Sequence, residues 1–468
     1  MARQVNEKTA RELLNDPVEK VICKMAVPTI IAQLITVIYN LTDTLFVSRL
    51  GTSATAAVGV NSTIETTITM VGMFIASGAA SYIARLLGAK KKEHGDQVFS
   101  TSFFMAFIIG IIFAVFGLIF IKPLVDIFGA DENCRTYAIQ YGTYIFIASP
   151  FMIISYLLNQ CLRSEGSPTF AMIGIGLGGI LNCFLDPIFI FSLGLGVKGA
   201  SIATAISKVI SCLILLYPYV LKKSKISLSI KYFKLKAEDV KEVSAIGSTS
   251  LLRTGCNVLA STLMNRAASG VSTAMLAAIS VSNRVMLFPF NIILGFGQGY
   301  SPVVGYNWGA ERYDRTEQSL SFAMKVSIIG GIIMGVIGFV FSRQIIGVFN
   351  SQADAEVMAN GMLCIRFQSI VLPMHAFLSI INMCYAGIGK AKQALLLSTA
   401  RQGYCFLPLI FLLPAIFGGT ALTAVQAAAD LLSLLVAAPL GIKAIMLFRE
   451  KYKETSNAAS ISESAVTH

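Results

Sequence analysis

The stretch VFSTSFFMAFIIGIIFAVFGLIFI, Val98–Ile121, decides the fold because its 24 residues include no charged side chain. As an α-helix it would be roughly 36 Å long at about 1.5 Å per residue, which is enough to cross the hydrocarbon core of a bilayer. Backbone polar groups inside a bilayer must be satisfied within the segment, and a helix does this. The stretch therefore predicts a transmembrane helix.

Apolar stretches of comparable length recur along the whole chain of 468 residues, of which 55% are hydrophobic and 13% are charged. That charged share is about half of what an ordinary soluble domain carries. The composition therefore excludes a soluble globular protein, a disordered chain and a small disulfide scaffold. We predict an all-α membrane protein with twelve transmembrane helices, at residues 25–48, 60–84, 98–121, 137–162, 170–192, 200–221, 244–268, 280–304, 319–342, 358–385, 394–415 and 420–442.

The formal net charge of +12 is explained by where the basic residues lie. If both termini are cytoplasmic, the predicted inner segments hold 25 of the 37 Lys and Arg residues, and the outer loops hold six. Such an excess on the inner side predicts a multi-pass protein of the bacterial inner membrane with both termini in the cytoplasm. Clusters such as Lys90–Lys92 could bind nucleic acid, but orientation and contact with anionic lipid explain them better. We expect no nucleic-acid partner.

The chain contains an internal repeat. Sliding the sequence against itself by 221 residues without gaps places Gly78–Arg163 over Gly299–Cys384. An offset that covers six helices preserves their direction, so we expect two parallel six-helix lobes, an arrangement suited to alternating access. The predicted parts are a cytoplasmic N-terminal segment (1–24), an N-lobe (25–221), a basic cytoplasmic linker (222–241), a C-lobe (242–448) and a mobile cytoplasmic tail (449–468).

Acidic residues inside predicted spans need a reason, because a carboxylate at the bilayer centre costs about 2.5 to 3.5 kcal/mol. Four are found: Asp43, Glu65, Asp186 and Asp430. Such groups usually pair with a base, face a wet cavity or take part in transport.

Two of these acids have a polar residue one helical turn before them, Tyr39 before Asp43 and Asn182 before Asp186. Both carboxylates are expected roughly 8 to 9 Å inside the outer ends of their spans, at about 1.5 Å per residue. Two further polar residues fall near this level: Glu65 and Thr204. We interpret the cluster as a site that binds H⁺ or Na⁺ when a cavity opens, which couples transport to an ion gradient. The alternative is that each acid neutralises a buried base.

The second half differs in charge. Its spans contain one acid, Asp430, and four arginines: Arg253, Arg284, Arg366 and Arg401. His375 is the one histidine expected within a span, where it could relay protons, although a hydrogen-bonded core histidine is the commoner case. The sequence assigns no role to these residues.

Several motifs, in order along nearly the whole chain, resemble the multidrug and toxic compound extrusion (MATE) family, and its DinF-like branch best. They are YNLTDT at Tyr39–Thr44 followed by Gly51, LNCFLDPIF at Leu181–Phe189, KGA at Lys198–Ala200 followed by Ala203 and Thr204, and GQGYSPVVGYNWGA at Gly297–Ala310. Any one of these motifs is weak. Their order on a repeat of twelve predicted spans makes the resemblance specific.

The resemblance implies a monomeric antiporter, coupled to H⁺ or Na⁺, that exports small organic and often cationic compounds. The coupling acids of that branch match Asp43 and Asp186, where Na⁺ would also bind. Polar and aromatic positions of its cavity match Tyr39, Asn182, Thr204, Tyr141 and Asn159. It implies no enzymatic activity, no structural metal and no resident cofactor.

Glu65 and Lys208 depart from the family pattern. Lys208 follows Thr204 by four residues and so shares its helix face. We hypothesise that Glu65 and Lys208 form an ion pair at the edge of the acidic cluster. The alternative function is a flippase of lipid-linked oligosaccharides from the same superfamily, which a basic cavity open to lipid would favour. A membrane enzyme or channel is disfavoured, because the sequence has no HExxH, nucleophile elbow or repeated filter.

Overall fold

The computed structural model describes residues 12–349 and 354–466, and no strand occurs in these ranges. Contacts divide the chain into two compact units, which are described separately. Unit 1 is built mainly of Val27–Gly247, and unit 2 of Leu13–Ala26 together with the chain from Ser248 onward. The boundaries therefore fall inside two long helices instead of inside the predicted linker, residues 222–241.

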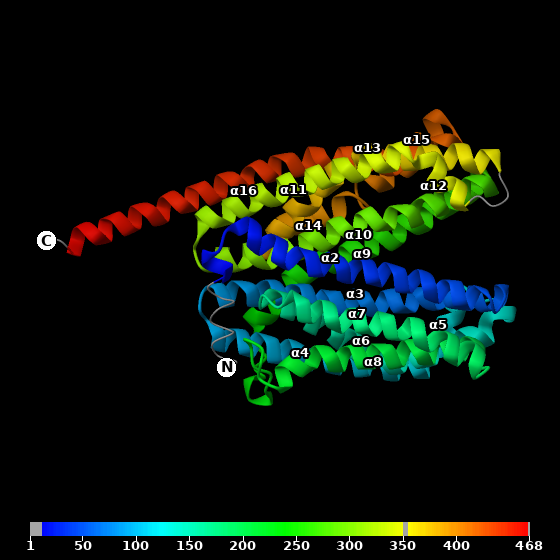
Figure 1. The fold of residues 1–468 in the computed structure, drawn as a ribbon, viewed down its shortest axis with the longest axis horizontal. Coiled ribbons are helices and arrows are strands. Elements are labelled where there is room, and N and C mark those ends of the chain that lie inside the picture. The colour runs from blue at the N-terminus through cyan, green and yellow to red at the C-terminus, as the bar shows by residue number, and fades with distance from the viewer. Residues whose placement is uncertain (1–11, 350–353, 467–468) are drawn as a thin grey trace. The chain divides into compact units, whose positions relative to one another are not determined.

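Unit 1 is a bundle around α6 (Figure 1). Its elements are α2 (Val18–Ser48), α3 (Thr52–Gly88), α4 (Lys92–Ile119), α5 (Ile121–Ile127), α6 (Glu132–Ser164), α7 (Pro168–Pro187), the π-helix η1 (Ile188–Ser192), α8 (Gly196–Val220) and the 3₁₀ turn η2 (Ile230–Tyr232). The most apolar window of α6 is 72% buried against its neighbours, but that of α4 is only 22% buried. An apolar helix that the protein itself does not cover is suited to contact with lipid.

Unit 2 repeats this plan around α13, which contacts α10, α11, α14 and α16. Its elements are α9 (Ala237–Val271), α10 (Thr273–Gly309), α11 (Tyr313–Val340), α12 (Ser342–Phe349), α13 (Ala355–Gly387), α14 (Ala391–Ala400), α15 (Phe406–Phe417), the 3₁₀ turn η3 (Gly419–Ala421) and α16 (Leu422–Val466).

Ten of the described helices are long and apolar enough to cross a membrane. Two predicted spans differ from the simple picture. The span at 244–268 lies in α9, which has 35 residues but also carries several charges. The span at 394–415 is not one helix, because α14 ends at Ala400, α15 begins at Phe406 and the five residues between them form turns.

The C-terminal segment, expected to be a mobile tail from residue 449, is helical as far as Val466. Figure 1 shows it as a direct continuation of α16. Arg449 Nε donates to Glu317 Oε1 at 2.8 Å, and Lys451 Nζ lies 2.6 Å from Glu454 Oε2 one turn later. The tail thus extends a membrane helix, and only residues 467–468 at this end lie outside the described residues.

The two units confirm the duplication but shift its register. Gly110 on α4 packs against Pro150 of α6, and Gly331 on α11 packs against Pro373 of α13 in the same way. The glycines are 221 positions apart, as in the ungapped match, but the prolines are 223 apart. Two residues are therefore inserted between α12 and α13, and the ungapped pairing is wrong by two positions from there on.

The basic linker is attached to unit 1 by hydrogen bonds. Asp96 Oδ1 on α4 accepts from the backbone N–H of Ser227 at 2.8 Å. One turn further along, the hydroxyl of Thr101 donates to the carbonyl of Lys234 and accepts from its N–H, at 3.2 and 3.1 Å. The segment after α8 is thus held along the first turns of α4.

Candidate functional site

The polar residues predicted in the N-lobe meet inside unit 1, where α2, α3, α6, α7 and α8 each contribute a side chain. On α7, Asn182 and Asp186 are both buried, and Asn182 Nδ2 donates to Asp186 Oδ1 at 3.1 Å. The same amide lies 3.3 Å from Thr204 Oγ1 on α8. Pro187 follows Asp186 and has no N–H to continue the ladder, and the chain passes into a π-helical turn there. Asp186 therefore lies where the regular helix ends.

Asp43 on α2 brings a second carboxyl group to this point, near enough to Asp186 for the two acids to influence each other. Several acceptor atoms around the pair are buried and receive no hydrogen bond. They are Asp43 Oδ1, Asp186 Oδ2, Asn182 Oδ1 and Ser207 Oγ. Ionised carboxylates have no donor, so two of them in contact need a proton or another cation between them. The carboxyl cluster thus has more buried acceptor atoms than the described donors satisfy.

The Lys208 ammonium does not form an ion pair within 4.0 Å with Glu65, in contrast to the direct pair that the sequence suggests. It donates to the hydroxyl of Tyr39 at 2.8 Å and lies 4.9 Å from the centre of that ring. Glu65 accepts from the buried Tyr141 hydroxyl at 3.4 Å. The two opposite charges still influence each other at longer range. Each charged group thus contacts a tyrosine from another helix: Lys208 on α8 contacts Tyr39 of α2, and Glu65 on α3 contacts Tyr141 of α6.

A cavity of about 100 Å³ is lined by Asn182 and Thr204, but neither Asp43 nor Asp186 lines it. Four of its lining residues were predicted: Tyr39, Asn182, Thr204 and Lys208. Polar lining residues that were not predicted include Gln33, Tyr156 and Ser207. Thr36 precedes Tyr39 by three residues and shares its helix face, but Gln33 precedes it by six and is turned well away from it, so spacing did not identify Gln33. No comparable signal exists for Tyr156 on α6, because only the packing of unit 1 turns it toward the cavity.

Asn159 is not part of this cluster, so its predicted contact with substrate is not supported by its position. Its Nδ2 donates to the carbonyl of Ala171 at 2.9 Å, and its Oδ1 accepts from Arg163. In unit 2, Asn382 makes the same bond to Ala394 at 2.8 Å. A contact present in both repeats indicates that this asparagine braces successive helices.

Within the described ranges, no group of three or more His, Cys, Asp or Glu side chains is placed to hold a metal ion.

The protein-family model described as MatE matches residues 28–188 and 250–412, one region in each repeat. The chain belongs to the MatE family. This family consists of membrane transporters, in agreement with the duplicated helical fold. Its match covers every residue of the unit 1 cluster except those on α8, which are Thr204, Ser207 and Lys208.

Among curated relatives of this MatE protein is the multidrug export protein MepA of Staphylococcus saprophyticus, 29% identical over 84% of this chain and 87% of the relative. MepA of Staphylococcus aureus is 28% identical over 86% of this chain and 89% of the relative. A solved MATE structure in complex with MaL6 has a TM-score of 0.89 and 24% identity, covering 94% of this chain and 99% of its own. The structural likeness shows that the fold is that of MATE transporters.

Proposed function

We propose that this MatE protein is a cation-coupled antiporter of the bacterial inner membrane that exports organic, cationic or amphipathic compounds by alternating access. The observation that carries the proposal is the set of buried acceptor oxygens around Asp43 and Asp186 that receive no hydrogen bond. Such a set binds H⁺ or Na⁺ favourably and repels anions. The curated relatives are named as multidrug exporters, which supports the export of varied small molecules.

The coupling follows from competition for the same two carboxylates. A cation taken up between Asp43 and Asp186 neutralises the pair and weakens its attraction for a cationic substrate in the cavity next to Asn182. Loss of that cation restores the attraction. Because a ligand shifts a conformational equilibrium only by its differential affinity for the two states, ion and substrate that exclude one another are exchanged and not carried together.

Orientation is part of the proposal. With 25 of 37 basic residues on one side, both termini face the cytoplasm and export runs outward. In everted membrane vesicles the same transport appears as accumulation, so a fluorescent cation such as ethidium should be taken up when an H⁺ or Na⁺ gradient is imposed. Imposing the two gradients separately identifies the coupling ion.

The test uses the isosteric variants Asp43→Asn and Asp186→Asn. Each should abolish gradient-driven uptake while membrane levels of the protein stay normal. Asp126→Asn is the matched control, because Asp126 is an exposed carboxylate paired with Arg135 at 2.6 Å outside the cluster. Normal uptake in both cluster variants would refute the proposal.

The second candidate function is a lipid-linked oligosaccharide flippase. It is favoured by a different observation, the arginine-containing cavity of unit 2. Resistance of cells to cationic dyes and biocides, compared with and without the gene, separates the two functions, because a flippase confers none.

A further inference from the structure

Unit 2 contains a cavity of about 460 Å³ that the unit 1 cluster does not involve. It lies where α14 stops and α15 starts, and Arg401 and Gln402 from the break line it. Irregular backbone at membrane depth is tolerated where it lines a cavity, and broken helices of this kind form binding sites in transporters. The interruption between α14 and α15 is therefore expected to serve a binding site in this cavity.

Polar side chains in the cavity wall are left without partners. Gln368 Oε1, His375 Nδ1 and Gln402 Oε1 are buried and make no hydrogen bond. Gln368 on α13 is only 5% exposed. Buried polar atoms in native proteins are nearly always satisfied, so three unsatisfied atoms around one cavity point to an occupant.

The cavity also carries a positive charge that the described residues do not balance. Arg253 on α9 lines it and has no hydrogen bond or ion pair among them. The second lining arginine, Arg401, is neutralised by Asp430, whose Oδ1 is 2.6 Å from Arg401 Nε, and it stacks on Phe290 at 4.3 Å. No acidic residue of the described chain lines the cavity. A guanidinium at this depth is costly unless something compensates it.

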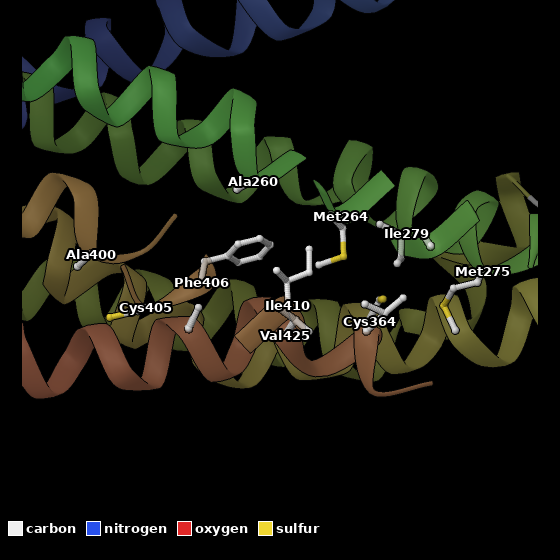
Figure 2. Close-up of a cluster of buried hydrophobic side chains, with 13 residues drawn as sticks. Ala260, Met264, Met275, Ile279, Cys364, Ala400, Cys405, Phe406, Ile410 and Val425 are labelled. Carbon is white, nitrogen blue, oxygen red and sulfur yellow. The ribbon is translucent and has the colours of Figure 1, made fainter. Parts of the chain in front are cut away.

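The other side of the cavity is apolar and aromatic. Figure 2 shows the Phe406 ring of α15 and the Met264 side chain of α9 pointing toward one another, with Ile279 of α10 beyond. Phe406 belongs to a buried cluster that continues into α16, so this wall is well supported. A thioether and an aromatic ring make a surface that accepts flat apolar groups of varied shape.

We propose that the unit 2 cavity binds an organic anion with an aromatic body, its acidic group on Arg253 and its rings against the wall formed by Met264 and Phe406. The amides of Gln368 and Gln402 bind the remaining polar groups of the ligand. The protein then has two binding sites of opposite charge preference, one in each repeat. This site does not depend on ion coupling, and its test needs no gradient. A failure here is therefore distinguishable from a failure of the export proposal.

Binding is measured by calorimetry on the full-length protein in phosphatidylcholine nanodiscs, with empty nanodiscs subtracted. The probes are 6-hydroxynaphthalene-2-sulfonate, whose hydroxyl can donate to an amide oxygen, and a derivative of the same ring with trimethylammonium in place of the sulfonate. Arg253→Gln should weaken binding of the sulfonate by about ten-fold or more, as loss of a charge-assisted hydrogen bond requires, and leave the cation unaffected. Arg253→Lys, which keeps the charge, should retain part of the affinity.

Arg284→Gln is the matched control, because Arg284 is an exposed arginine of α10 that does not line the cavity. It should bind the sulfonate as the wild type does. Gln368→Leu is an independent variant that removes an unsatisfied amide and should also weaken binding. It provides the test if Arg253→Gln fails to fold. The proposal is overturned if sulfonate binding survives both cavity substitutions, or if Arg284→Gln weakens it equally.

A second set of nanodiscs containing phosphatidylglycerol identifies the source of the anion. If the lipid competes with the sulfonate and Arg253→Gln abolishes that competition, the natural occupant is an anionic lipid held by Arg253, and the aromatic part of the proposal is wrong. Absence of competition, with the Arg253 dependence intact, assigns the site to soluble anions. Competition that is independent of Arg253 contradicts the proposed role of this arginine.

Discussion

Replacing Glu165 by glutamine should flatten the pH dependence of stability in the range from about pH 4.5 to about pH 7. Glu165 directly follows α6, outside the membrane-spanning segments, and is only 1% exposed. Its carboxylate accepts from the Tyr219 hydroxyl and from the Lys225 N–H, both at 2.8 Å, and from the Ser224 hydroxyl. It therefore joins the end of α6 to the start of the basic linker, residues 222–241.

Burial raises the pKa of Glu165 from 4.5 to about 7, although its three donors and the Lys225 charge act in the opposite direction. The folded protein thus binds a proton that the unfolded chain has already released within this range. Its contribution to stability is fully present below about pH 4.5 and is lost as the pH rises to about 7. At about 1.4 kcal/mol per pH unit, this loss is on the order of 3 kcal/mol.

The measurement is thermal unfolding of purified protein in detergent across about pH 4.5 to 8, followed by intrinsic fluorescence. The wild-type midpoint should fall as the pH rises, by roughly 2–4 °C for each kcal/mol in a domain of this size. In Glu165→Gln the part of this fall that comes from Glu165 should be missing. Glu93→Gln provides the control, because Glu93 is exposed at the start of α4 on the same side of unit 1 and should keep the wild-type slope.

Only the slope of the unfolding midpoint against pH tests the role of burial, because glutamine at position 165 changes the hydrogen bonds at every pH. If Glu165→Gln keeps the full wild-type slope, burial of this carboxyl does not control the transition. A slope of opposite sign in the wild type would mean that the three donors outweigh burial and hold the carboxylate ionised.

Three substitutions test the packing of the helices. Gly331→Ala should destabilise unit 2 by about 1–3 kcal/mol in thermal unfolding, because its Cβ would lie 2.8 Å from the Cα of Pro373 on α13. Gly330→Ala is the control and should be neutral, because its Cβ would have no atom within 4 Å. Asn61→Ala should cost about 1–3 kcal/mol in the same assay, because its buried amide donates to a carbonyl of α6 at 3.0 Å. Arg401→Gln should reduce stability by about 3–5 kcal/mol by leaving Asp430 buried and unpaired, and adding Asp430→Asn should recover most of it; no recovery would argue against the pair.

Much of the architecture follows from the sequence alone. Uncharged stretches such as Val98–Ile121 fix the membrane helices, because lipid admits only helical backbone there, and the repeat of glycines fixes the parallel halves. The sequence predicted one helix at 394–415, although the structure has two. Arg401 and Gly403 lie inside an otherwise apolar stretch that is still long enough for a span, and hydropathy does not reveal a break within it.

The carboxyl cluster was predictable for Asp43, Asp186 and Asn182, since helical spacing and depth place them at one level. Depth does not fix the rotation of a helix about its axis, so the partner of Lys208 was not predictable. Packing of α8 against α2 gives it Tyr39 and not Glu65.

The sequence by itself therefore determined which segments enter the membrane, because placing charge and unpaired backbone in lipid is costly. It also determined that the chain is duplicated, because its two halves match along their length, and it identified the acids that lie within the spans. Only the tertiary structure decided the contacts of individual side chains. It assigned Asn159 to a brace between helices, buried Glu165 under the linker, and left Arg253 facing a cavity without a counter-charge. These outcomes depend on how each helix is rotated about its axis and on where it ends. The packing of side chains sets both to within a few ångströms, and the residue order of a single helix does not specify them.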